Sequence, residues 1–334
     1  MRFDIAKKWL LLMLMAVISI SHARTADTDT APKPANYPKK PLQLIVPSSA
    51  GGGTDVMIRA LVAEMKLPQP IAIVNREGAS GTIGTGEVAR AKADGYTLVS
   101  GMPAPFYIQP NITNLFFSIE DFRNIAVISP DEQLVIVVTP DSPIKTFEDL
   151  KKIMLAGGDI KFGTSNPGSV GHCGLADLFH QMGVKDNFEM VPFKGAANAL
   201  TALMGDHINV STCDLAEALP RLRNNQVAPL AVFGEKRSEA LPDVPCLTEL
   251  GYPGTGYAVA FKWISVPKNT PDDIVEYLKA EINKAVLSDG YKKFIREVNG
   301  LDTHTMTEAE LTQKLKDCRK KYKEILTMTG MAKK

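Results

Sequence analysis

The stretch "VPSSAGGGTD", Val46 to Asp55, places three consecutive glycines between an apolar run and a helical pattern. The residues before it, "LQLIVP" (42–47), predict a buried strand. In "DVMIRALVAEMK" (55–66) the apolar side chains fall on one helical face, and we expect Thr54 to cap this helix. Thr146 and Thr270 are the expected caps of two later helices. A strand, a glycine loop and a helix in that order are typical of an α/β fold.

The same order recurs at three more places in the chain. The loop "EGASGTIGTG" follows the predicted strand "IAIV", while "SNPGSVGHCG" and "FKGAAN" follow two later strands. The first amide groups of a helix lack partners and lie at the positive end of its dipole, so each loop is a candidate anion site. Because ligands of open α/β sheets bind at the carboxyl ends of the strands, we expect the four loops to surround one ligand.

The length and the order of the predicted elements indicate two domains. A chain of 334 residues exceeds what one hydrophobic core usually organises. Strands alternate with helices in residues 40–137 and again in 138–257, whereas 258–334 add one apolar run followed only by helices. We therefore expect an α/β protein whose first domain is formed by 40–137 and 258–334. Residues 138–257 form an inserted second domain, and two crossing segments make a hinge.

The N-terminus predicts secretion. Residues 1–23 carry basic residues, an apolar run from Trp9 to Ile20 and a small-x-small site, which predict a signal peptide cleaved near Ala23. Residues 24–39 are expected to be a flexible leader. Cleavage removes three basic residues and one acid, which takes the formal net charge from +1 to −1. This charge gives no reason to expect nucleic acid or an anionic membrane as a partner.

The cysteines are widely spaced and lie far from the cleavage site. The chain has Cys173, Cys213, Cys246 and Cys318, so no lipid-anchored cysteine is expected and no CxxC pair suggests a zinc site. A bridge between Cys213 and Cys246 and four free thiols are both compatible with the sequence.

No cofactor and no catalysis are expected. "GGGTD" lacks the Gly-Lys-Ser/Thr ending of a P-loop, and neither "GTIGTG" nor "GSVGHCG" reproduces GxGxxG. A Cys/His hydrolase is the enzyme alternative, because Cys173 follows His172 at a predicted helix start. However, adjacent helical residues point apart, and His180 lies about 12 Å along the helix, beyond hydrogen-bond reach.

Five segments together resemble the periplasmic solute-binding receptors of tripartite tricarboxylate transporters, the Bug or TctC type. They are "VPSSAGGGTDVMIRAL", "NREGASGTIGTGEVARAKADGYTLVSG", "GTSNPGSVGHCGLADLF", "VPFKGAANALTALMGDHINV" and "EKRSEALPDVPCLTELGYPG", within about residues 40–330. The resemblance implies a type II, flytrap-like fold and a periplasmic receptor that delivers a small carboxylate to integral membrane transporter subunits. We expect a monomer. A sensor that presents its ligand to a signalling partner remains an alternative.

The resemblance also implies a site built from both domains. The expected ligand-binding residues are Ser48, Ser49, Ala50, Gly51, Asp55, Gly81, Thr82, Thr164, Ser165, Ser169, His172, Lys194 and Asp214. Asp55 matches the family motif but also suits the first turn of a helix, and Lys194 either binds a distal carboxylate or is a solvated loop charge. For Asp214 we favour helix capping over ligand contact.

Two departures from the family pattern bear on the ligand. The chain has Ser48, Ser49 and Ala50 where the family usually has bulky and prolyl residues, and Arg76-Glu77-Gly78 where it usually has Arg-Pro-Gly. Glu77 either meets a charged ligand group or, as we favour, points to solvent. The sequence leaves the identity of the carboxylate open.

Overall fold

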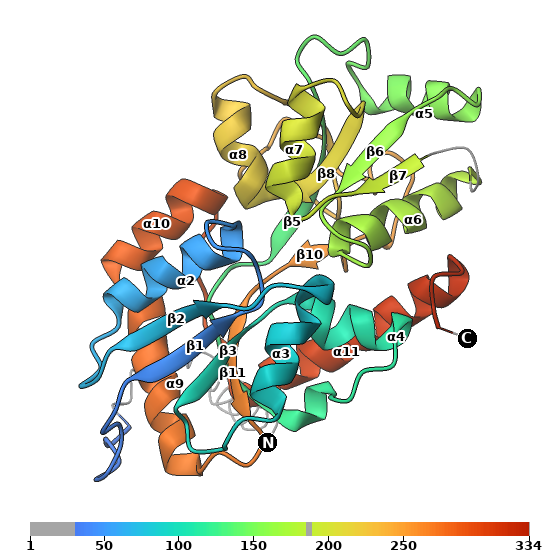
Figure 1. Cartoon of the computed structure of the whole chain (residues 1–334). Helices are drawn as coiled ribbons and strands as arrows, with labels where there is room; N and C mark the ends of the chain where they lie inside the picture. Colours follow the sequence, from blue (N-terminus) through green and yellow to red (C-terminus); the bar gives the residue numbers. More distant parts are fainter. Residues whose placement is uncertain (1–30, 185–188, 334) are drawn as a thin grey trace, which may run out of the picture.

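The computed structural model describes residues 31–184 and 189–333, which form two β-sheets with helices packed around them (Figure 1). The predicted signal peptide, its cleavage site and the first part of the predicted leader lie outside the described residues. The fold is mixed α/β, as expected.

The first sheet has the strand order β2-β1-β3-β11-β4. Its parallel strands are β1 (Leu42–Val46), β2 (Ile71–Asn75) and β3 (Thr97–Gly101). β11 (Trp263–Pro267) runs antiparallel between β3 and β4 (Phe122–Val127). The parallel strands therefore direct their carboxyl ends to one edge of the sheet.

Helices from both ends of the chain cover this sheet. They are α2 (Gly53–Glu64), α3 (Thr82–Ala89), α4 (Gln109–Ile112), α9 (Asp272–Val286), α10 (Asp289–Asn299) and α11 (Glu308–Met328), with the short helices η1 (Ala79–Gly81), η2 (Ala104–Ile108) and η3 (Ile119–Asp121). Both α9 and α11 pack against β4, and α10 packs against α2. The late helices thus cover a sheet whose strands, except β11, come from the early part of the chain.

The second sheet has the order β10-β5-β8-β6-β7, and β9 pairs with β5. Its strands are β5 (Glu132–Val138), β6 (Lys161–Thr164), β7 (Glu189–Pro192), β8 (Val210–Asp214), β9 (Ala228–Val232) and β10 (Val259–Ala260). Its helices are α5 (Phe147–Leu155), α6 (Val170–Met182), α7 (Ala196–Met204) and α8 (Leu215–Arg223). β6, β7 and β8 are parallel, so their carboxyl ends also share one edge.

The strand pairing places β5 and β10 in the second sheet, so the domain boundary differs from the predicted one. Residues 132–137, which we expected in the first domain, belong to β5 and pair with β8 and β9 in the second sheet. β10, also expected in the first domain, pairs with β5. The apolar run at β5 is one continuous strand, so the chain must cross before it. We place the crossing segments at 128–131 and 261–262.

Of the three predicted helix caps, one is confirmed and two are wrong. Thr146 caps α5 in a reciprocal capping box, with Asp149 N donating to Thr146 Oγ1 at 3.1 Å. Thr54 does not cap α2, because the helix begins at Gly53 and Thr54 is buried inside its first turn. Thr270 does not cap α9, because its hydroxyl donates to the Pro267 carbonyl at 2.7 Å.

The sequence did not predict β4, whose "FRNIAV" has two polar residues in adjacent positions. Asn124 is buried in this edge strand, where its Oδ1 accepts from Trp263 Nε1 at 3.0 Å and from Ser265 Oγ at 2.8 Å. A polar residue that is hydrogen-bonded in the core looks, in sequence, like a surface residue.

All four cysteines are free thiols. Cys213 pairs across the sheet with Val135, Val135 with Val232, and Val232 with Cys246. Three strand spacings separate the two cysteines by about 14 Å. A disulfide needs Cα atoms within about 7 Å, so the fold excludes the bridge that the sequence allowed.

Within residues 31–184 and 189–333, no helix is both long enough and apolar enough to span a bilayer.

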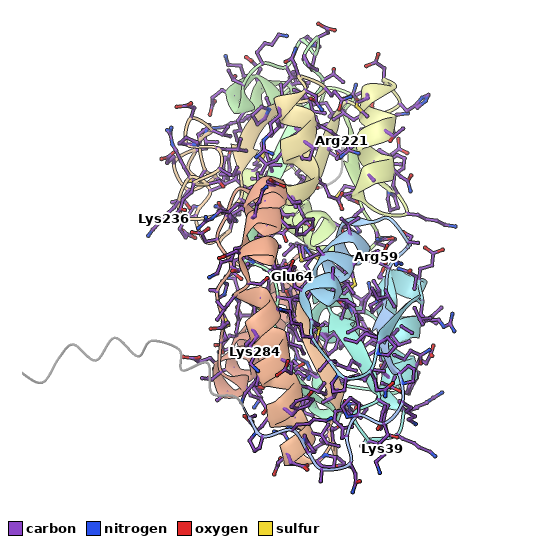
Figure 2. The ribbon with its side chains drawn as sticks, turned by 90° about the vertical axis from the view of Figure 1, so that its left-hand side faces the viewer. Lys39, Arg59, Glu64, Arg221, Lys236 and Lys284 are labelled. Atoms are coloured by element: carbon purple, nitrogen blue, oxygen red, sulfur yellow. The ribbon has the colours of Figure 1, made fainter. Side chains whose placement is uncertain are left out.

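Charged side chains lie at the surface around both sheets: Lys284 lies on α9, which covers the first sheet, and Lys236 lies beside the second sheet (Figure 2). Arg59 of α2 and Arg221 of α8 lie on the same side of the molecule (Figure 2).

Leu278→Ala tests the packing of α9 on the first sheet. Leu278 is fully buried, so the loss of its side chain should lower the free energy of unfolding by about 2–5 kcal/mol. Leu155→Ala is the matched control, because Leu155 is 59% exposed and should change stability by under about 1 kcal/mol. Chemical denaturation measures both, and equal losses would contradict the assigned core.

Candidate functional site

The carboxyl ends of the two sets of parallel strands meet where the two sheets adjoin. The Ser80 hydroxyl, in the loop after β2, donates to the Pro167 carbonyl, in the loop after β6, at 3.0 Å. Gln109 Nε2 donates to the same carbonyl at 3.0 Å. Gly53 lies so close to α8 that a Cβ on it would be 3.3 Å from Glu217 Oε1. The glycine loops of both sheets therefore face one another.

Asp55 organises the first glycine loop. Its Oδ2 accepts from Gly51 N at 2.8 Å and Arg59 Nε at 2.9 Å, and its Oδ1 accepts from Asn75 Nδ2 at 3.0 Å. Asn75 also donates to the Ser48 carbonyl at 3.1 Å. Burial alone would raise the pKa of Asp55, but the hydrogen bonds from Arg59, Gly51 and Asn75 outweigh it and lower the pKa. Since both oxygens are engaged, we propose that Asp55 positions the loop rather than contacting the ligand.

The second loop packs directly on the first. Gly81 has φ +88°, and a Cβ there would lie 3.2 Å from the Pro47 carbonyl and 3.3 Å from the Pro105 ring. Glycine is favoured where the backbone is left-handed and a neighbouring backbone is this close. Thr82 opens α3 and its hydroxyl donates to the Ala79 carbonyl at 2.9 Å, so this hydroxyl is already engaged. Glu77 is exposed.

Ser169 and His172 fix the loop after β6. Ser169 caps α6, and its Oγ accepts from His172 N at 3.2 Å. His172 Nδ1 accepts from Gly168 N at 2.9 Å, and burial lowers the pKa of this histidine. His172 is therefore a neutral side chain near pH 7. The adjoining Ser165 carbonyl accepts from Gly195 N at 3.0 Å, which ties this loop to the one after β7.

The structure decides one expectation for a charged residue, Asp214, and places a second charged residue, Lys194, at the surface. Asp214 stands at the capping position of α8, but its side chain makes no capping hydrogen bond, so the favoured capping role is wrong. Its Oδ2 instead lies 3.6 Å from Lys262 Nζ. Lys194 is exposed in the loop after β7, so its ammonium group is accessible to solvent.

Four buried hydroxyls in or just after the parallel strands have no hydrogen-bond partner among the described residues. They belong to Ser48 after β1, Ser100 in β3, Thr164 at the end of β6 and Thr212 in β8. An unpaired buried hydroxyl costs roughly 1–3 kcal/mol, so a set of four in or just after these strands calls for an explanation. Donors and acceptors from a bound ligand would supply the missing partners. The neighbouring Ser49, Ala50 and Gly51 are exposed.

The sequence reasoning missed a cluster of four charged residues where the chain crosses between the sheets: Lys262 and Glu132, which are buried, and Asp214 and Glu217, which are half-buried. Lys262 Nζ lies 3.0 Å from Glu132 Oε1, and the two side chains are 7% and 0% exposed. Burial would lower the pKa of Lys262, but Glu132 and Asp214 outweigh it and raise the pKa, so Lys262 is charged. Burial raises the pKa of Glu132, and Lys262 opposes that rise.

A signal for this cluster was present in "AVAFKWISV", where Lys262 is the single charge in an apolar run. A lysine in a buried strand needs an ionic partner, which sequence alone does not identify. Ser100 and Thr212 were missed because each lies inside a predicted strand rather than in a glycine loop.

The thiol expected in the enzyme alternative is unreactive. Cys173 is fully buried, and burial raises its pKa to about 12. The protonated thiol is a poor nucleophile. In the part of the chain that the structure describes, no three or more His, Cys, Asp or Glu side chains group as metal ligands.

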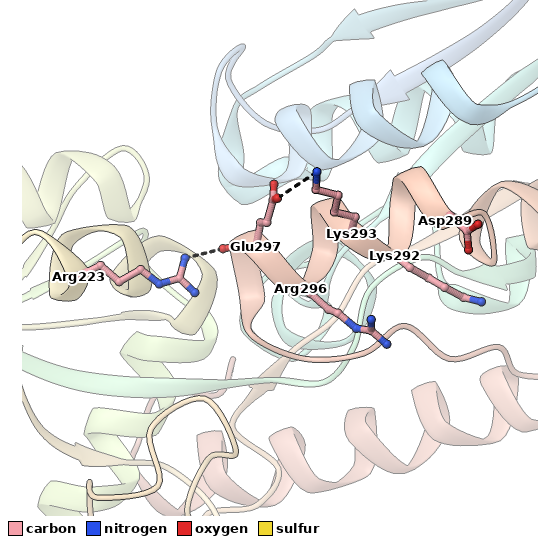
Figure 3. A pocket seen from close by; sticks show the side chains of 6 residues that line it. All are labelled: Arg223, Asp289, Lys292, Lys293, Arg296 and Glu297. Carbon is pink, nitrogen blue, oxygen red and sulfur yellow. Dashed lines mark hydrogen bonds and ion pairs between the residues drawn. The ribbon is translucent and has the colours of Figure 1, made fainter.

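A separate surface hollow of about 650 Å³ lies between α8 and α10 (Figure 3). It is lined by Arg223, Asp289, Lys292, Lys293, Arg296 and Glu297. Arg223 Nη1 donates to the Glu297 carbonyl at 2.7 Å, which joins a helix of the second sheet to one of the first. None of the predicted ligand-binding residues lines this hollow, so we assign the site to the strand ends instead.

Comparison with known proteins identifies the class. Residues 57–331 match the family model "Tripartite tricarboxylate transporter family receptor", and the chain belongs to this family. It is 34% identical to Protein BugT of Bordetella pertussis over 285 residues, 82% of this chain and 85% of that protein.

Solved structures agree with this assignment. The periplasmic binding protein BugD superposes with a TM-score of 0.80 at 25% identity, over 89% of this chain and 100% of that one. R. palustris Rpa4515 with adipate gives 0.80 at 26% identity, over 89% and 99%. The fold and the family are therefore those of periplasmic solute-binding proteins.

Lys262→Met tests the buried ion pair. Removing the cation leaves Glu132 buried without its partner, which should lower the free energy of unfolding by about 3–5 kcal/mol at pH 8. Lys284→Met, at an exposed ion pair, should cost under about 1 kcal/mol. The double variant Lys262→Met/Glu132→Gln should recover most of the loss in urea denaturation. A single variant as stable as the control would contradict the pairing.

Glu217→Gln tests the ionisation of the other buried acid. Burial, followed by repulsion from Asp214, raises the pKa of Glu217 to about 7. Its pKa in the unfolded chain is lower, so the folded protein binds the extra proton between about pH 4.5 and 7 and loses stability as pH rises through that window. The variant should lack this component of the pH dependence in denaturation series at pH 5, 6, 7 and 8. Parallel pH profiles for the two proteins would show that Glu217 titrates normally.

Proposed function

We propose that this protein is a periplasmic receptor that binds a small carboxylate between its two domains and delivers it to the integral membrane subunits of a tripartite tricarboxylate-type transporter. The observation that carries the proposal is the set of unpartnered buried hydroxyls in or just after the parallel strands, two from each sheet. Family membership supports the receptor role, and R. palustris Rpa4515 with adipate supports a carboxylate ligand.

The geometry suggests how a carboxylate is held. The amino ends of α2, α3 and α6 adjoin the glycine loops and favour negative charge. The Ser48 and Thr164 hydroxyls belong to different sheets, are both unpartnered and would donate to carboxylate oxygens. Among the predicted residues, we keep Ser49, Ala50, Gly51, Gly81, Thr82, Ser165, Ser169 and His172 as loop contacts, Lys194 as a candidate cation for a distal group, and Asp214 as a polar neighbour.

The contacts between the loops suggest how binding becomes a signal. Ser80 and Gln109 of the first unit both donate to Pro167 of the second. A ligand that contacts both units would favour this closed arrangement by its differential affinity for it. We propose that the membrane subunits recognise the closed form, and that the carboxylate is bound and released without chemical change.

The N-terminal sequence supports the location. We propose that the signal peptide directs the chain to the periplasm, that cleavage follows Ala23, and that the mature protein acts as a monomer.

Thr164→Val gives the sharpest test of the site, because it removes a buried hydroxyl and keeps the shape of the side chain. Without ligand, the free energy of unfolding of the variant should be higher by about 1–3 kcal/mol, because the buried hydroxyl that it lacks has no partner. With the best carboxylate from a thermal-shift screen, its affinity should fall by roughly tenfold or more, because a hydrogen bond to a charged group contributes about 1.5–3 kcal/mol.

Thr201→Val is the matched control, since Thr201 is exposed on α7. In the screen, ligand at about 100 times Kd should stabilise the wild-type protein by roughly 2.7 kcal/mol. If no carboxylate shifts the melting temperature while a neutral sugar does, the proposed ligand class is wrong. Unchanged affinity in Thr164→Val would remove the end of β6 from the site.

A further inference from the structure

We propose that Glu217 forms a subsite for the ammonium group of the ligand, so that this receptor prefers carboxylates that also carry a protonated amine over plain dicarboxylates. The inference rests on the proposed carboxylate-binding function and specifies its substrate class.

The position of Glu217 places its carboxylate beside the first glycine loop. Glu217 lies in the first turn of α8, directly after β8, and its Oε1 would be 3.3 Å from a Cβ on Gly53. Gly53 opens α2 at the end of that loop. A ligand carboxylate held by this loop therefore has Glu217 within reach of its neighbouring atoms. Thr164, the last residue of β6, and Thr212, in the middle of the adjoining β8, are 0% and 1% exposed, and their hydroxyls have no partner among the described residues.

Glu217 also has an unused acceptor. Its Oε2 is buried and has no hydrogen-bond partner in the described part of the chain. Arg221, one turn along α8, donates Nη1 to the Glu217 backbone carbonyl at 2.8 Å rather than to the carboxylate. An ionised carboxylate accepts hydrogen bonds and donates none, so the group that fits Oε2 is a donor.

The charges around Glu217 favour a cationic donor. Asp214 and Glu132 add two further acids, whereas Lys262 is already shared between them at 3.6 Å and 3.0 Å. With all four groups ionised the cluster carries an excess of two negative charges, before Arg221 is counted. A second ligand carboxylate would meet repulsion here, whereas an ammonium group would restore the balance.

The ionisation of Glu217 adds a proton linkage. Burial first, then Asp214, raises its pKa to about 7, and Lys262 and Arg221 oppose the rise. A bound ammonium group would favour the ionised form, so binding releases a proton. Affinity for the amine should therefore increase as pH rises from 6 to 8, whereas affinity for a plain dicarboxylate should not increase.

Calorimetry on the mature protein with matched ligands tests this subsite. The pairs are aspartate with succinate, 4-aminobutyrate with succinate, and 5-aminovalerate with glutarate. In at least one pair the amine should bind tenfold or more tightly than the dicarboxylate. Glu217→Gln should weaken that amine tenfold or more and leave the dicarboxylate unchanged or tighter. Glu148→Gln, at an exposed glutamate of α5, is the matched control and should change neither.

The outcomes separate this inference from the function on which it rests. If dicarboxylates bind and no amine binds more tightly, or if Glu217→Gln weakens both classes equally, the ammonium subsite is wrong and the carboxylate receptor stands. If no carboxylate of either class binds, both proposals fail. The comparison on the wild-type protein decides the question even if the variant does not fold.

Discussion

The buried ion pair between Lys262 and Glu132 is the interaction on which the arrangement of the two sheets depends. Glu132 opens β5 just after one crossing segment, and Lys262 lies in the other, between β10 and β11. A charge this deeply buried is stable only with its partner, so the two crossing segments must run side by side. Because the same lysine also lies 3.6 Å from Asp214 at the end of β8, the pair fixes the crossing relative to the binding edge.

The site follows from that constraint. Once the sheets adjoin at this crossing, the parallel strands of both bring their carboxyl ends together, and the glycine loops can approach closely. Gly81 packs on Pro47, and Gly53 lies against Glu217. The hydroxyls left unpaired at these ends, such as those of Ser48 and Thr164, are a cost that the free protein bears. In the proposed site, a bound ligand would recover this cost.

Sequence reasoning predicted the alternation of strands and helices and the glycine loops, because both are local patterns. It misplaced the crossing, since β5 has the same apolar character whichever sheet it joins. It missed β4 and the role of Lys262, because Asn124 and Lys262 acquire their partners only in the folded chain. Asp55 illustrates the same limit within the site: its position in the motif was evident, but its use of both oxygens inside the loop was not.

A crystal structure of the mature protein with the tightest-binding carboxylate from the ligand screen would test the proposed site most directly. A carboxylate group should lie between the two sheets, within hydrogen-bond distance of the Ser48 or Thr164 hydroxyl and beside the first glycine loop. A carboxylate found instead in the basic hollow between α8 and α10, with the hydroxyls at the strand ends still unpaired, would contradict it.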